Sequence, residues 1–177
     1  MKNILLTLTV FFCINCSKEE TTAVSNDNGL TASDKAAALK IHNDARADVG
    51  VAALQWSDAL AADAAEWANN LAKQDRMYHS DNDQRNGQGE NLYMTTATDR
   101  ADSGKNASQA WYNEIQLYTY SPIGSGQNNF SAIGHYTQMI WKSTTQVGMA
   151  LAVSETGATY VVARYSPAGN YVGETPY

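Results

Sequence analysis

The sequence predicts an α+β domain in which helices pack on an antiparallel sheet. Four segments with helical periodicity lie between residues 33 and 141, and two segments rich in Val, Ala and Tyr follow them. Helices followed by a run of strands are typical of α+β domains. About 145 residues remain after the N-terminal segments described below, which is enough for one domain. No internal repeat indicates a second domain.

Four segments carry apolar or alanine residues at the spacing of a helix face. Ser33 and Ser57 stand where the first two helices would begin, because a hydroxyl oxygen can accept a hydrogen bond from the first turn. Gly50 stands where the first helix would end. The helices are expected at residues 33–50, 58–73, 103–117 and 130–141.

Two strands and two loops complete the expected domain. The segments 146–153 and 158–166 flank Ser154-Glu155-Thr156-Gly157, which is the pattern of a hairpin. Residues 75–88 are polar and rich in turn residues, so we expect a loop there that contains His79. A second turn-rich stretch covers residues 121–129.

The first 15 residues have the properties of a signal peptide. Lys2 gives a positive start, and the run from Ile4 to Ile14 is almost wholly apolar, yet shorter than the roughly 20 residues that span a bilayer. Charge begins soon after Cys16, in an arrangement that resembles the lipidation site of a bacterial lipoprotein. We expect a signal peptide at 1–15, a tether lipidated on Cys16 at 16–30, and a folded domain at 31–177. An ordinary cleaved signal peptide is the alternative.

Lipidation would place the domain outside the cell, on the outer membrane or cell surface of a bacterium. Both cysteines, Cys13 and Cys16, precede the folded domain, so no disulfide is expected in it. Without Lys2 the 12 basic residues become 11, against 18 acidic residues, which is a net charge of about −7. No basic stripe is present, so nucleic acid is not an expected partner, and membrane contact is expected through the anchor on Cys16 only.

Four residues are candidates for chemistry, although sequence spacing alone does not bring them together. They are separated by 11, 24 and 21 residues, and each taken singly is compatible with an ordinary surface position. The third histidine, His42, is expected to be a structural hydrogen-bonding residue on the first helix. The four candidates are His79, Glu90, Glu114 and His135.

Two long motifs connect these candidates. The block Gly134-His135-Tyr136-Thr137-Gln138-Met139-Ile140-Trp141-Lys142-Ser143-Thr144 and the block from Tyr160 to Tyr171 resemble the two signatures of the CAP superfamily, which comprises cysteine-rich secretory proteins, antigen 5 and class 1 pathogenesis-related proteins. Gly89-Glu90-Asn91-Leu92 fits the same family, as do His42-Asn43 with Arg46 and Leu54-Gln55-Trp56-Ser57. The resemblance covers residues 36–171. One difference is that Met149 and Ala163 occupy positions where secreted eukaryotic members commonly have cysteine.

The resemblance implies a three-layer α-β-α sandwich with a central antiparallel sheet and a cleft in which the four candidates converge. It implies His79 and His135 as ligands of zinc or another divalent ion. Two neutral imidazoles and two carboxylates around such an ion sum to zero charge, which lowers the cost of holding it in a partly desolvated cleft. Alternatively, Glu90 and Glu114 hold the outer nitrogens of the histidines, or all four form a network that binds nothing.

Three classes of function follow from the resemblance. The chain is expected to be a surface-tethered binding module for a small lipid-like ligand, such as a sterol, or for a protein. A metal-dependent hydrolase, with Glu90 or Glu114 as general base toward a zinc-bound water, is one alternative. It is less favoured because the chain has no His-Glu-x-x-His motif and no recognisable nucleophile motif. A structural or adhesive protein with a vestigial cleft is the other.

Five aromatic residues near the third and fourth predicted helices admit two interpretations. They line an apolar groove for a ligand, or they pack in the core and around the cleft, and packing is favoured. These residues are Trp111, Tyr112, Tyr118, Tyr120 and Phe130.

Overall fold

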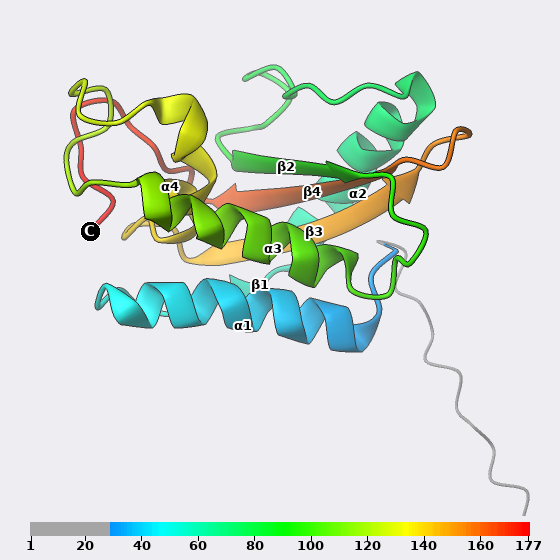
Figure 1. The fold of residues 1–177 in the computed structure, drawn as a ribbon, viewed down its shortest axis with the longest axis horizontal. Coiled ribbons are helices and arrows are strands. Elements are labelled where there is room, and N and C mark those ends of the chain that lie inside the picture. Colours follow the sequence, from blue (N-terminus) through cyan, green and yellow to red (C-terminus); the bar gives the residue numbers. More distant parts are fainter. Residues whose placement is uncertain (1–28) are drawn as a thin grey trace, which may run out of the picture.

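A computed structural model describes residues 29–177, which form three layers (Figure 1). A four-stranded sheet lies in the middle. Helices α1 (Ala32–Asp48) and α3 (Ser103–Asn113) cover one face, and helix α2 (Asp58–Gln74) covers the other. The expected three-layer α-β-α sandwich is confirmed.

The expected signal peptide, the lipidated Cys16 and the tether as far as residue 28 lie outside the described residues. Leu30, at the end of the expected tether, is 1% exposed and belongs to the core. Among the described residues, the helices are too short or too polar to cross a membrane.

The sheet has the strand order β1-β3-β4-β2. Strands β3 (Gln146–Val153) and β4 (Thr159–Ser166) form the predicted hairpin, and β2 (Gly89–Thr95) pairs antiparallel to β4. Strand β1 (Gln55–Trp56) pairs parallel to β3. Strand β2 was not predicted, because its first four residues are all buried and show no alternation of polar and apolar positions.

Alternate residues of the strands build two separate cores, one on each face of the sheet. Val161, Ala163 and Tyr165 of β4 pack toward α1 and α3, whereas Tyr160 and Val162 pack toward α2. Alanines of α2 let that helix lie close to the sheet. At Gly148 the approach is so close that a Cβ atom would overlap backbone atoms of the first turn of α2.

One of the two predicted N-caps is correct. The Ser57 hydroxyl accepts a hydrogen bond from Leu60 N at 3.3 Å and caps α2. Helix α1 is capped by Thr31, whose hydroxyl accepts from Asp34 N at 3.1 Å, so the prediction of Ser33 was wrong. The helix begins at Ala32, which places Ser33 inside its first turn.

The third and fourth predicted helices are both interrupted. After α3 the chain continues as a 3₁₀ turn, η1 (Glu114–Leu117). The expected helix at 130–141 is a 3₁₀ turn, η2 (Phe130–Ala132), followed by the short helix α4 (Gly134–Met139), with Ile133 between them at a φ of −134°. The interruption gives α4 an N-terminus of its own, and that N-terminus contributes to the site described below.

Arg46 ties α1 to the far end of α4 and to the turn that leads into β3. Its guanidinium donates to the carbonyl oxygens of Met139, Trp141 and Thr144 at 2.8–3.0 Å, and its Nε donates to Ala52 O at 2.6 Å. Burial lowers the pKa of Arg46 to about 10, so it remains charged at neutral pH. The guanidinium group thus donates hydrogen bonds to four backbone carbonyl oxygens.

Asp34 joins the N-termini of two helices. Its carboxylate is 1% exposed and accepts from Gly104 N and Lys105 N, both at 2.8 Å, in the first turn of α3. The N-cap residue Asp102 makes no side-chain capping bond, so Asp34 supplies the cap from another helix.

We predict that Asp34→Asn lowers the free energy of unfolding by about 1–3 kcal/mol, because the amide NH₂ would face a backbone N–H. Urea denaturation measures the change. Asp44→Asn is the control, since Asp44 forms an exposed ion pair with Lys40 that contributes at most about 1 kcal/mol. Equal stabilities of the two variants would contradict the capping role.

Candidate functional site

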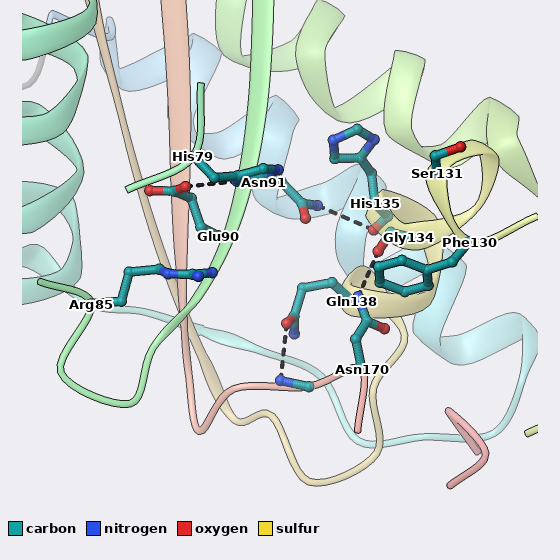
Figure 2. Close-up of a pocket in the computed structure, with 11 residues that line it drawn as sticks. His79, Arg85, Glu90, Asn91, Phe130, Ser131, Gly134, His135, Gln138 and Asn170 are labelled. Atoms are coloured by element: carbon teal, nitrogen blue, oxygen red, sulfur yellow. Dashed lines mark hydrogen bonds and ion pairs between the residues drawn. The ribbon is translucent and has the colours of Figure 1, made fainter. Parts of the chain in front are cut away.

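A cavity of about 520 Å³ lies at the end of the sheet where β2 begins. Its walls come from the loop before β2, from β2 itself, from η2 and α4, and from the segment after β4 (Figure 2). Three of the four predicted site residues line it, and Glu114 does not. The lining residues are His79, Arg85, Glu90, Asn91, Phe130, Ser131, Gly134, His135, Gln138, Gly169 and Asn170.

His79 and Glu90 form the first of two histidine–carboxylate pairs. The imidazole Nδ1 of His79 lies 2.7 Å from Glu90 Oε1, which also accepts from Ser80 N at 3.0 Å. Glu90 Oε2 accepts from Ser80 Oγ at 2.7 Å and from Arg164 Nη2 at 3.1 Å. Burial favours a raised pKa for Glu90, but these donors outweigh it and the pKa is lowered. Glu90 is therefore a buried carboxylate whose charge is stabilised by four donors from the protein.

His135 and Glu114 form the second pair. The Nδ1 atom of His135 lies 2.6 Å from Glu114 Oε1, and Glu114 Oε2 accepts from the backbone N–H groups of His135 and Tyr136, both at 3.0 Å. Glu114 thus caps the N-terminus of α4 with the same carboxylate that orients the imidazole. The His135 ring stacks on Trp111, with centroids 6.1 Å apart.

Asn91 links the second pair to the buried core. Its amide nitrogen donates to His135 O at 3.1 Å and to the Tyr165 hydroxyl at 3.0 Å. In Figure 2 Asn91 lies between Glu90 and His135. Since Glu90 and Asn91 are consecutive in β2, they project to opposite faces of the sheet. The two pairs therefore approach the cavity from different layers.

His42 completes this network, as the sequence analysis predicted for a structural histidine. Its Nδ1 lies 2.9 Å from Ala38 O and must donate there, so Nε2 accepts from the Tyr165 hydroxyl at 2.8 Å. Tyr165 can then accept from Asn91. Burial, helped by the charge of Arg46, lowers the pKa of His42 to about 4. The neutral ring is the form that this chain of bonds requires.

In both cavity histidines Nδ1 faces a carboxylate oxygen, so a hydrogen on Nδ1 is bonded there and Nε2 points away from the carboxylate. Within residues 29–177, no protein group bonds to Nε2 of either ring. In the same range, no set of three or more His, Cys, Asp and Glu side chains is arranged to hold a metal ion. The four candidates form two pairs in which each carboxylate holds the Nδ1 side of a histidine, and metal binding by His79 and His135 stays a prediction.

Gln138 also lines the cavity. It belongs to the block from Gly134 to Thr144, but it was not predicted as a site residue. Its Oε1 accepts from Gly169 N at 2.9 Å, and its Nε2 donates to Thr144 Oγ1 at 3.2 Å. Gly89 leaves the space for this amide, because a Cβ atom there would overlap Gln138 Oε1. Arg85 was also missed, since nothing in the sequence distinguishes it from other loop arginines.

The five aromatic residues do not line a shared groove. Trp111 is 2% exposed and belongs to the core, and Tyr112 and Tyr118 pack against Tyr136. Tyr120 packs on Tyr177, and of the five only Phe130 lines the cavity.

Comparisons with known proteins agree with this architecture. The family model described as CAP, the cysteine-rich secretory protein family, matches residues 39–165, a range that contains all four candidate residues. Pathogenesis-related protein 1A of Nicotiana tabacum is 38% identical over 146 residues, which is 78% of each chain. Golgi-associated plant pathogenesis-related protein 1 of Homo sapiens is 36% identical over 136 residues, which is 77% of this chain and 84% of that protein. The crystal structure of NaASP2 with Zn²⁺ superimposes with a TM-score of 0.72 at 29% identity, covering 86% of this chain and 88% of that one.

The buried, neutral His42 predicts a pH dependence of stability. Its pKa is about 4 in the folded chain and about 6.5 in the unfolded chain, so between these values the unfolded chain binds more protons. We expect the free energy of unfolding to fall as the pH is lowered from about 6.5 to about 4, by at most about 3 kcal/mol from this group. His42→Gln should be less stable at neutral pH and should lose this part of the slope. Urea denaturation at a series of pH values measures both, and parallel profiles would contradict the assignment.

Proposed function

This chain belongs to the CAP family of cysteine-rich secretory proteins, and from that premise we propose that it is an extracellular binding module. In this proposal the module is tethered to the cell surface through Cys16, and its cavity binds a divalent ion such as zinc through His79 and His135. The observation that carries the proposal is that both rings hold a carboxylate with Nδ1 and leave Nε2 without a protein partner within the described chain.

The donor chemistry fits a zinc ion. Imidazole nitrogen is among the preferred zinc ligands, and a carboxylate on the outer nitrogen orients the ring and raises its basicity. Glu90 and Glu114 occupy those outer positions, at 2.7 and 2.6 Å. Two protein ligands leave further coordination positions to water or to a bound molecule. NaASP2 was crystallised with Zn²⁺, which supports the choice of metal.

The cavity walls favour a polar ligand over the sterol or acyl chain that the family resemblance suggested. Phe130 is the only large apolar side chain that lines the cavity, and the other side chains there are histidine, arginine, carboxylate, amide and hydroxyl groups. A lipid tail could not bond the donor and acceptor capacity of these groups that the protein leaves open, such as the Nε2 atoms of His79 and His135. A small polar molecule, or a polar group of a protein partner, satisfies them.

The two alternatives have less support. As a general base in a hydrolase, Glu90 would need a free oxygen, but its two oxygens already accept from four donors. Glu114 does not line the cavity and accepts from three donors. A vestigial cleft is disfavoured because both imidazoles are oriented by the charge-assisted bonds that a binding site requires.

We predict that the purified domain binds zinc at neutral pH and that His79→Ala and His135→Ala each weaken binding at least about tenfold. Isothermal titration measures the affinity. The affinity should also fall in acid, because protons compete with the metal for its ligand atoms.

Glu155→Ala is the control variant, because Glu155 is an exposed carboxylate in the β3–β4 turn and reports weak binding of zinc to surface acids. Its affinity should equal that of the wild type, and circular dichroism confirms that every variant is folded. The metal proposal would be abandoned if the wild type gave no heat of binding, or if both histidine variants bound zinc as tightly as the control.

A further inference from the structure

Arg85 brings a positive charge to the cavity without an acidic partner. It lines the cavity from the loop before β2, and in Figure 2 its side chain extends from that loop below Glu90. Its Nη2 donates to Asn82 Oδ1, a neutral acceptor. Within residues 29–177 it takes part in no ion pair.

Glu90, the carboxylate of the cavity lining, forms no ion pair with Arg85. Glu90 is paired with Arg164 at 3.1 Å, and the remaining acceptor capacity of Glu90 is used by His79 and Ser80. Arg164 is 3% exposed. The neighbouring charge of Arg85 adds to the effect of burial in lowering the pKa of Arg164, so the two guanidinium groups repel each other. Glu90 is the carboxylate that forms an ion pair with Arg164, and it forms none with Arg85.

Arg85 and two residues next to the cavity wall have buried polar atoms without partners among the described residues: Gln88 precedes β2, and Arg164 pairs with Glu90. In the part of the chain that the structure describes, seven buried side-chain nitrogen or oxygen atoms have no hydrogen-bond partner, and four of the seven belong to Arg85, Gln88 and Arg164. They are Arg85 Nε, Gln88 Oε1, Arg164 Nε and Arg164 Nη1. Three of these four atoms are guanidinium donors, and buried donors ordinarily have an acceptor.

We infer that the cavity binds a small acidic ligand and that Arg85 receives its carboxylate or phosphate group. The inference rests on the proposed function of this cavity and names the class of ligand. The forked N–H groups of arginine suit both kinds of oxyanion. An anion at Arg85 also relieves the repulsion between Arg85 and Arg164.

The rest of the cavity suits the remainder of such a ligand. Asn91, Ser131, Gln138 and Asn170 offer hydroxyl and amide groups, and Phe130 offers one apolar face. A cavity of about 520 Å³ lies within the range of small-molecule sites. The ligand is therefore a compact polar acid.

Isothermal titration of the metal-free domain with succinate, succinamide and inorganic phosphate tests the inference. Succinate and succinamide have nearly the same shape, so a preference for succinate isolates the contribution of charge. We expect the wild type to bind succinate or phosphate at millimolar or lower concentration, and the stronger of the two identifies the preferred oxyanion. Succinamide should bind at least about tenfold more weakly.

Arg85→Gln should weaken oxyanion binding at least about tenfold, and Arg85→Lys should restore part of it. Arg76→Gln is the matched control, because Arg76 stacks on Tyr78 outside the cavity and should leave affinity unchanged. Raising the salt concentration should weaken binding. Equal binding of succinate and succinamide, equal binding by Arg85→Gln and wild type, or no binding of either oxyanion would overturn the inference and would leave ordered water as the partner of Arg85.

Zinc titration of Arg85→Gln separates this inference from the metal proposal. Arg85 is no ligand in that proposal, so the variant should bind zinc at least as tightly as the wild type. Oxyanion binding without zinc binding would reject the metal and keep the acidic ligand, and the reverse result would reject the acidic ligand alone.

Discussion

The antiparallel register of β2 on β4 is the constraint on which the site depends. It sets Glu90 opposite Arg164 and Asn91 opposite Ala163. Glu90 therefore meets its arginine and the loop after α2, whereas Asn91 reaches Tyr165 and the backbone of His135 on the other face. A slip of one residue would exchange the two faces. It would place a buried carboxylate in the apolar core and remove the support of both histidines.

Each carboxylate of the site is also part of the fold. Glu114 orients His135 and caps α4, a helix of six residues that is too short to be stable by itself. Glu90 orients His79 and compensates Arg164 inside the layer next to α2. The geometry of the two imidazoles therefore forms together with the tertiary structure.

Residues 29–177 contain no cysteine, and hydrogen bonds and close packing connect their elements. Met149 and Ala163, at the positions where secreted eukaryotic relatives commonly have cysteine, are register partners across β3 and β4 and are both fully buried. Their contact is an apolar cross-strand pair. Arg46 and the chain of bonds from His42 through Tyr165 to Asn91 connect α1 to the other elements.

Local sequence patterns were sufficient to predict α2, the β3–β4 hairpin and the family. Helix faces, turns and signature motifs depend on residues that are close together in the sequence. They also identified all four members of the two pairs. They did not reveal β2, whose opening residues are buried on both faces, or the break at Ile133, which depends on Glu114 capping a new helix. The partition into His79 with Glu90 and His135 with Glu114, and the position of Arg85 in the cavity, arose only in the folded chain. Those contacts join residues on separate layers, and their pairing is decided by strand register and by the path of the loops.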